Sequence, residues 1–194
     1  MKIRHLPWMA IALGFAALAA CDRKDQDQRT SAARDPGREQ MAFPPDVRND
    51  EDFANSAARA NLAEIEAGRL AASKGGDDDV RKFGRQMVDD HGQAQVKLTD
   101  LGAKKGFRLP TETDDARRQD LSKLSQLSGA DFDQKFAEMM VADHEKAVAL
   151  FGKNATGAKD GDVRDFAKST LPTLQHHLKV AQELKNKVGE STAD

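Results

Sequence analysis

The chain of 194 residues contains no tyrosine and only one cysteine, and both scarcities exclude chemistry. Without tyrosine, no tyrosyl radical can form. A single cysteine cannot close an internal disulfide or build a zinc ribbon, and Cys21 lies too near the N-terminus to serve as a thiol nucleophile in a folded domain. No Gly-x-Ser-x-Gly motif or Ser-His-Asp pattern indicates a hydrolase. The sequence therefore carries no signal for an enzyme.

Two further patterns are missing. No stretch alternates between apolar and polar residues, so β-strands are not expected. The net charge of −2, with 32% charged residues, gives a mixed surface without the basic stripe that nucleic-acid binding requires. Ala, Leu, Lys, Glu, Asp and Gln dominate instead, which favours an all-α protein.

The N-terminus has the pattern of an export signal. Lys2 and Arg4 precede an uncharged apolar run over residues 8–20, which is too short to span a bilayer as a lone helix. The run ends in Leu18-Ala19-Ala20-Cys21, which resembles the lipobox of bacterial lipoproteins. That resemblance implies cleavage before Cys21 and lipidation of Cys21; the alternative is an ordinary secretory signal with a chance cysteine. We expect an envelope protein that faces the periplasm and is lipid-anchored to the inner or the outer membrane.

The remaining chain divides by composition. Residues 21–50 are polar, include Pro36, Pro44 and Pro45, and have few residues that could form a core, so we expect a disordered tether. Residues 51–188 have the length of one domain, and residues 189–194 form a C-terminal tail.

Helix start and stop signals divide this domain into four long helices and one short helix. The predicted ranges are 52–73, a start at 77–79 continuing to 105, 114–127 for the short helix, 131–152, and 162–188, with Gly189 as the stop of the last helix. Four long helices with a long middle connection predict a four-helix bundle, ferritin-like or up-down-up-down. Asp162 is the expected N-cap of the last helix, and Pro172 should kink it.

Two segments repeat the same residues 53 positions apart, which indicates a duplicated helical unit. The spacing i, i+4, i+8, i+11 puts these residues on one stripe of each helix, so each histidine should face the core. The matching residues are Phe83, Met87, His91 and Ala94 in the first copy, and Phe136, Met140, His144 and Ala147 in the second.

The segments 87–91, 132–147 and 171–178, together with 62–71, resemble the bacterial DUF4142 family. The similarity covers roughly residues 53–184. The family consists of exported bacterial proteins, many of them lipoproteins, that are grouped with ferritin-like bundles, and its function is unknown. The resemblance therefore implies a fold and a location but no chemistry.

One polar residue lies near the middle of each long helix: Glu64, His91, His144 and His177. Metal sites in bundle cores are built from such residues, and three imidazoles with a carboxylate suit Zn, Cu, Fe or Ni. The alternative is a polar core layer in which Glu64 accepts hydrogen bonds from the histidines without a metal.

The neighbouring residues leave further alternatives open. Met87 and Met140 could ligate Cu(I) through their thioethers or simply pack in the core. Asp90 and Asp143 could form surface ion pairs or orient ligand histidines on other helices, while His176 is expected at the surface or the edge of the site. The Glu-x-x-His motif of di-iron ferritins is absent, because Val88, Val141 and Leu174 occupy its glutamate positions.

Two functions remain open. One is a metal-binding bundle of the cell envelope, and the other is a non-enzymatic structural or interaction protein with a metal-free polar core. The sequence identifies no protein partner.

Replacement of Cys21 by alanine should leave an uncleaved or differently processed precursor, because the lipobox needs its thiol. Immunoblotting and membrane fractionation of cells that express Cys21→Ala would show this. A variant that matures and stays with the membrane as the wild type does would contradict lipid anchoring.

Overall fold

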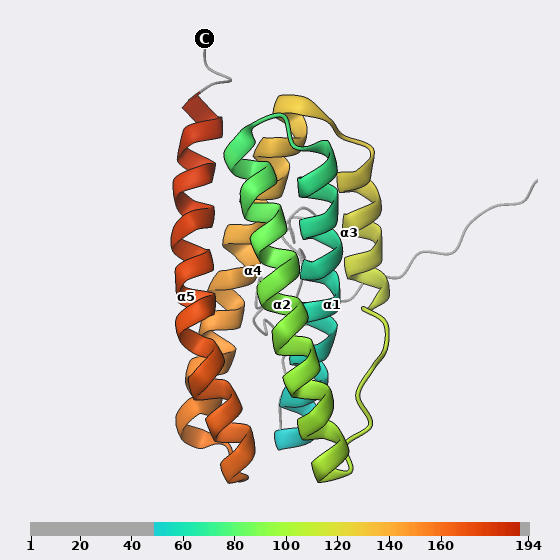
Figure 1. The fold of residues 1–194 in the computed structure, drawn as a ribbon, viewed down its shortest axis with the longest axis vertical. Helices are drawn as coiled ribbons and strands as arrows, with labels where there is room; N and C mark the ends of the chain where they lie inside the picture. Colours follow the sequence, from blue (N-terminus) through green and yellow to red (C-terminus); the bar gives the residue numbers. More distant parts are fainter. Residues whose placement is uncertain (1–48, 191–194) are drawn as a thin grey trace, which may run out of the picture. The chain divides into compact units, whose positions relative to one another are not determined.

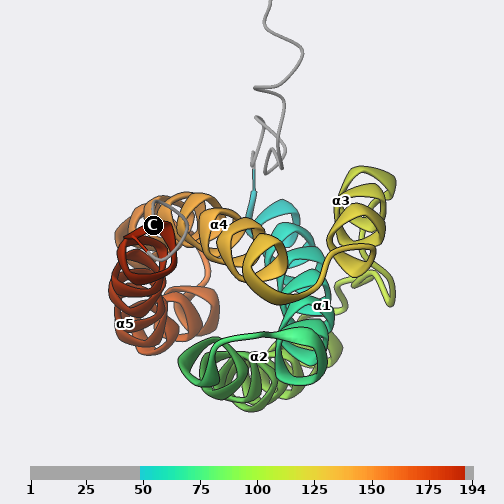
Figure 2. The same ribbon diagram turned by 90° about the horizontal axis from the view of Figure 1, so that it is seen from above.

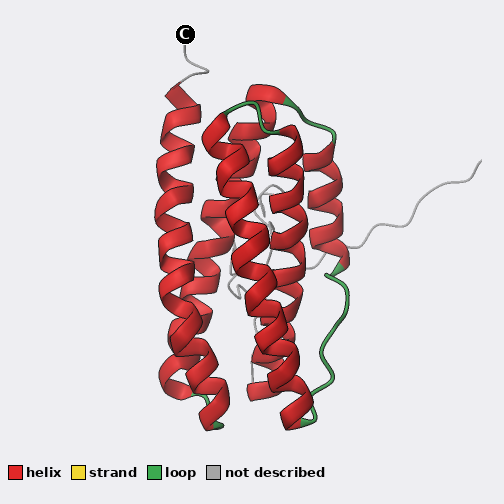
Figure 3. Cartoon of the chain, in the orientation of Figure 1, coloured by secondary structure: helices red, strands yellow, loops and turns green. Residues whose placement is uncertain are grey.

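The computed structural model describes residues 49–190, which form five helices (Figures 1 and 3). They are α1 (Asp50–Lys74), α2 (Asp78–Lys105), α3 (Asp115–Ser125), α4 (Gly129–Gly157) and α5 (Gly161–Glu190). Within this part of the chain there is no named strand, only an isolated bridge between Gly75 and Gly129. None of these helices combines the length and apolar character that a membrane crossing needs. The expected signal peptide, Cys21 and nearly all of the tether lie outside the described residues.

The four long helices form a bundle in which α1 pairs with α2, and α4 with α5. Helix α1 runs upward in Figure 1, α2 and α4 run downward, and α5 runs upward again. Two successive long helices thus share a direction, and the connection through α3 crosses the length of the bundle between them. This is the ferritin-like arrangement. Figure 2 shows α3 outside the ring of four, where it contacts α1 and α4.

Most helix starts agree with the sequence signals. Asn49 caps α1, and Asp77 caps α2 by accepting a hydrogen bond from the Asp79 amide at 2.7 Å. Gly106, with a φ of 72°, ends α2 in the left-handed conformation that glycine adopts most easily.

Three predicted helix ends were wrong. Helix α4 begins at Gly129 and continues past Gly152 to Gly157, because buried Phe151 and Ala155 pack in the core and outweigh the helix-breaking tendency of glycine. The side chain of Asp160, not Asp162, caps α5 by accepting from the amides of Asp162 and Val163. At the other end of α5, Gly189 lies inside the helix.

Helix α5 is continuous through Pro172, and its axis bends in the lower half (Figure 1). Proline has no amide hydrogen to donate to the carbonyl of Lys168 and crowds the preceding turn, so a bend is expected at this position.

A polar layer divides the apolar core of the bundle into two clusters. The cluster on one side includes Phe83, Phe132, Phe136, Met87 and Met140, and the other includes Phe53, Leu98, Phe151, Phe166 and Leu174. Four of the buried polar residues come between them along the helices: Glu64, His91, His144 and His177. The core is therefore interrupted at the level that the sequence predicted.

Two glycines set the close approach of α1 and α2. A Cβ atom on Gly84 would lie 2.7 Å from the Gly68 carbonyl oxygen and 2.7 Å from the Ala72 amide nitrogen. Both contacts are with backbone atoms, so neither can be relieved by turning a side chain.

Replacement of Gly84 by alanine should therefore lower the free energy of unfolding by about 1–3 kcal/mol, because the helices must separate. The matched control is Gly92→Ala in the same helix, where a Cβ meets nothing within 4 Å. That variant should be neutral or up to about 1 kcal/mol more stable, since alanine favours the helix. Urea denaturation measures the free energy of unfolding of both variants. If Gly84→Ala and Gly92→Ala change it equally, the close packing of α1 on α2 is contradicted.

Candidate metal centre

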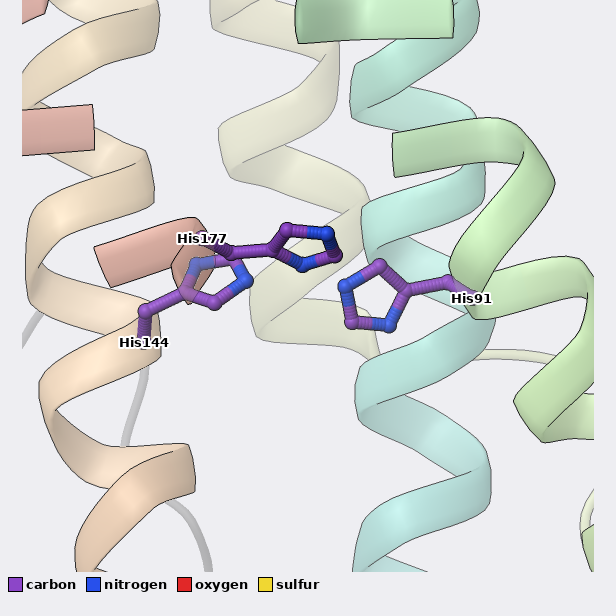
Figure 4. A group of neighbouring side chains, drawn as sticks. All are labelled: His91, His144 and His177. Carbon is purple, nitrogen blue, oxygen red and sulfur yellow. The ribbon is translucent and has the colours of Figure 1, made fainter. Parts of the chain in front are cut away.

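Three histidines from three helices meet in the middle of the bundle. Their side chains point toward one another from α2, α4 and α5 (Figure 4). The ring centroids of His91, His144 and His177 are separated by 5.2–5.6 Å. Their exposed fractions are 3%, 0% and 0%. One ring nitrogen from each histidine lies within 4.8 Å of the other two.

The outer nitrogen of each ring contacts an oxygen that can only accept a hydrogen bond. His91 Nδ1 lies 3.0 Å from Glu64 Oε2 and 3.0 Å from Asn61 Oδ1. His144 Nδ1 lies 2.9 Å from the Met140 carbonyl oxygen, and His177 Nε2 lies 2.9 Å from Asp90 Oδ2. The outer nitrogen must therefore carry the proton, which fixes the tautomer of each neutral ring.

The inner nitrogens have the opposite character. His91 Nε2, His144 Nε2 and His177 Nδ1 are buried and have no hydrogen-bond partner among the described residues. In the neutral rings each presents a lone pair. A buried polar atom without a partner costs about 1–3 kcal/mol, so a cation shared by all three would satisfy the group.

The spacing of the nitrogens also fits an ion. Three atoms no more than 4.8 Å apart share a point within about 2.8 Å of each, and Zn–N bonds measure about 2.0–2.1 Å. Ring movements of less than about 1 Å would therefore close the site. The oxygens behind the rings would hold the imidazoles in orientation, as such outer partners do in known metal sites.

The environment keeps two of the imidazoles neutral. Burial, together with the nearby His91 and His144, lowers the pKa of His177 to about 4, against the hydrogen bond and the charge of Asp90, which act to raise it. Burial likewise lowers the pKa of His144, although the charge of Glu64 opposes that shift. Both rings therefore present a lone pair at neutral pH, which is the form that binds metals.

Glu64 does not join the three inner nitrogens. Burial would raise its pKa, but the nearby His91 and His144, the hydrogen bond from His91, and the charge of Arg117 together lower it to about 2. The side chain lies behind His91, where it contacts the outer nitrogen. Of the four residues expected to converge, the structure brings three histidines together, and Glu64 is a charged partner of His91.

The other candidate residues lie around this group. Asp90 accepts a hydrogen bond from His177, which is the less favoured of the two roles considered for it. Met87 and Met140 are buried in the apolar cluster, and the Met140 carbonyl contacts His144. His176 is exposed, with its ring centroid 6.2 Å from that of His177.

Asp143 is buried and is not a surface residue. One of its oxygens, Oδ1, has no hydrogen-bond partner. Burial and the nearby charge of Glu64 raise its pKa to about 7, against the opposing charges of Arg117 and Lys146. Asp143 therefore lies near Glu64 and Arg117, on the side of the bundle that α3 covers.

Two residues that surround the histidines, Asn61 and Arg117, were not predicted from the sequence. Asn61 precedes Glu64 by one helical turn, and this i, i+3 spacing was a usable signal that both face His91. Arg117 comes from α3, is buried, and forms an ion pair with Asp114 at 2.7 Å. Only the packing of α3 against the bundle brings its charge near Glu64.

The family described as a domain of unknown function, DUF4142, matches residues 36–184. The chain belongs to this family. Among curated proteins, none matches the chain.

Two solved structures have a fold similar to that of this chain. One is a Streptomyces coelicolor protein of the DUF305 class, with a TM-score of 0.61 and 13% sequence identity, covering 73% of this chain and 94% of its own. The other is CopM in its Cu(II)-bound form, with a TM-score of 0.61 and 14% identity, covering 72% and 97%. At such low identity the likeness shows the helical fold alone.

Replacement of Asp143 by asparagine should change the pH dependence of stability. The carboxyl group has a pKa of about 7 when folded and an ordinary value of 3.8, so the wild type loses stability as pH rises through this window. Asparagine does not titrate. The free energy of unfolding of Asp143→Asn should therefore rise relative to that of the wild type by about 2–3 kcal/mol between pH 5 and pH 8.

Urea denaturation with a chelator present measures this difference. If the free energies of unfolding of variant and wild type differ by the same amount at pH 5 and at pH 8, Asp143 does not have the raised pKa.

Proposed function

We propose that this protein binds one transition-metal ion in its bundle core through His91, His144 and His177. The observation that carries the proposal is the set of three inner ring nitrogens, buried, mutually close and without partners. A polar core layer that served packing alone would satisfy these nitrogens, because leaving them unpaired is costly.

The charges around the site favour a divalent ion. Glu64 and Asp90 accept hydrogen bonds from two of the three histidines and supply two negative charges, while the histidines are neutral ligands. Imidazole nitrogen suits Cu, Zn, Ni and Fe, and it suits Mg or Ca poorly. We infer Cu(II) as the first candidate, and the fold shared with a protein solved in its Cu(II)-bound form supports this choice.

We further propose that the site works outside the cytoplasm, where the protein would hold the metal for storage, sensing or protection. The lipobox-like sequence ending at Cys21 supports an anchored, periplasm-facing protein, and the DUF305 neighbour is described as secreted. A bound ion would be held in the core by the three imidazoles, with Glu64, Asn61, Asp90 and the Met140 carbonyl fixing their orientation.

Metal titration of the purified protein, prepared without a histidine tag, tests this function. Cu(II), Zn(II) or Ni(II) should raise the melting temperature, because a ligand at 100 times its Kd stabilises the folded state by about 2.7 kcal/mol. The double variant His91→Ala/His144→Ala should lose the rise. Elemental analysis of protein from the periplasm would identify the ion held in the cell.

The control variant is His176→Ala, which removes an exposed histidine adjacent to the site. It should keep the full rise in melting temperature. A second variant, His144→Leu, guards against misfolding, because it replaces an imidazole whose Nε2 is buried without a partner by an apolar side chain of similar size. Its metal-free form should melt close to the wild type but show no response to metal. A wild type indifferent to all three ions would leave a structural polar core, and the protein would then be a non-enzymatic envelope protein.

A further inference from the structure

The three histidines are almost inaccessible, so an ion can reach them only between helices. Two seams of the bundle differ in how they are closed. The α1–α4 seam carries α3 on its outer side, with Leu121 and Leu124 buried against the bundle. No helix of the described chain covers the α2–α5 seam (Figure 2).

A pocket of about 70 Å³ lies in the uncovered α2–α5 seam and is lined by both His91 and His177. This volume has room for an ion with a few water molecules. The rest of its lining is largely polar and carries one charge of each sign, from Asp90 and Lys97, beside Gln93, Ser169, Thr170 and Thr173.

Asp90 connects the surface to the site. Its side chain is 31% exposed, yet its Oδ2 accepts a hydrogen bond from the fully buried His177 at 2.9 Å. The carboxylate therefore attracts cations from solvent and at the same time keeps the inner nitrogen of His177 free to bind one.

The α5 wall of the pocket is also the weaker part of that helix. Ser169, Thr170 and Thr173 of the lining flank Pro172, where one backbone hydrogen bond of the helix cannot form. Small outward movements of this segment break fewer bonds than they would in an uninterrupted helix.

The opposite side of the bundle offers a poorer route. A pocket of about 140 Å³ lined by α3 and α4 residues ends at Asp143 and contacts none of the three histidines. A separate void of only about 10 Å³, also lined by Asp143, lies beside Glu64 and Arg117 and likewise contacts none of the three histidines.

We propose that the metal ion enters and leaves the histidine centre between α2 and α5, through the pocket beside Asp90. This inference rests on the proposed metal binding and adds to it the path and the residue that admits the ion. Asp90 acts as a positioning residue, because it attracts the ion and orients His177 without belonging to the three inner ligands.

Stopped-flow measurement of Cu(II) association, and of its release to a chelator, tests the route. Ala94 lines the α2–α5 pocket and Ala142 lines the pocket on the α3 side, and both are half-buried. Ala94→Leu should slow association and release at least tenfold each while changing the Kd less than about threefold. Ala142→Leu, the matched control, should leave both rates unchanged.

Two further variants keep the test decisive if Ala94→Leu folds poorly. Thr173→Ile narrows the same pocket from α5 and should slow both rates in the same way. Asp90→Asn should slow association and reduce its dependence on ionic strength, because the attracting charge is lost. A merely structural role for Asp90 would leave that salt dependence unchanged.

Each outcome decides the proposal. Slowing by Ala142→Leu alone would move the route to the α3 side, and wild-type rates in Ala94→Leu and Thr173→Ile would exclude the α2–α5 route. A wild type that binds no Cu(II), Zn(II) or Ni(II) overturns the proposed function and the route with it. Normal equilibrium binding with unaffected kinetics overturns the route only.

Discussion

The organising interaction is the hydrogen bond that each core histidine makes on its outer side. Oxygens of Glu64, Asn61, Asp90 and the Met140 carbonyl accept hydrogen bonds from the outer ring N–H groups, so the inner nitrogen of each neutral ring presents a lone pair. Three lone pairs facing one another in an apolar core are unfavourable unless they share a positive partner. The bundle holds them in place because apolar clusters pack on both sides of this layer.

The helices contribute different parts of the site. Helices α2, α4 and α5 each supply one histidine, whereas α1 supplies Asn61 and Glu64, which orient and balance His91. Helix α3 covers the α1–α4 seam and brings the Arg117 charge near Glu64. The α2–α5 seam lacks such a cover, and it contains the pocket that contacts two of the three histidines.

Much of the fold followed from local signals because helix caps and apolar stripes act over a few residues. The starts of α1 and α2 and the end of α2 agree with these signals to within two residues. Gly152 and Gly189 misled the prediction, since the propensity of a single glycine is worth about 1 kcal/mol and core packing outweighs it. Whether α2 and α4 run in the same direction was undecided, because the connection through α3 is long enough for either topology.

The sequence by itself determined that His91, His144, His177 and Glu64 lie on buried stripes at a common level, because helical periodicity fixes both angle and height. Only the tertiary structure decided which ring nitrogen faces inward and that Glu64 stands behind His91. It also made Asp90 a partner of His177 and buried Asp143 beside Glu64. These outcomes depend on side-chain rotamers and on acceptors supplied by other helices, and neither is encoded in the spacing along one helix.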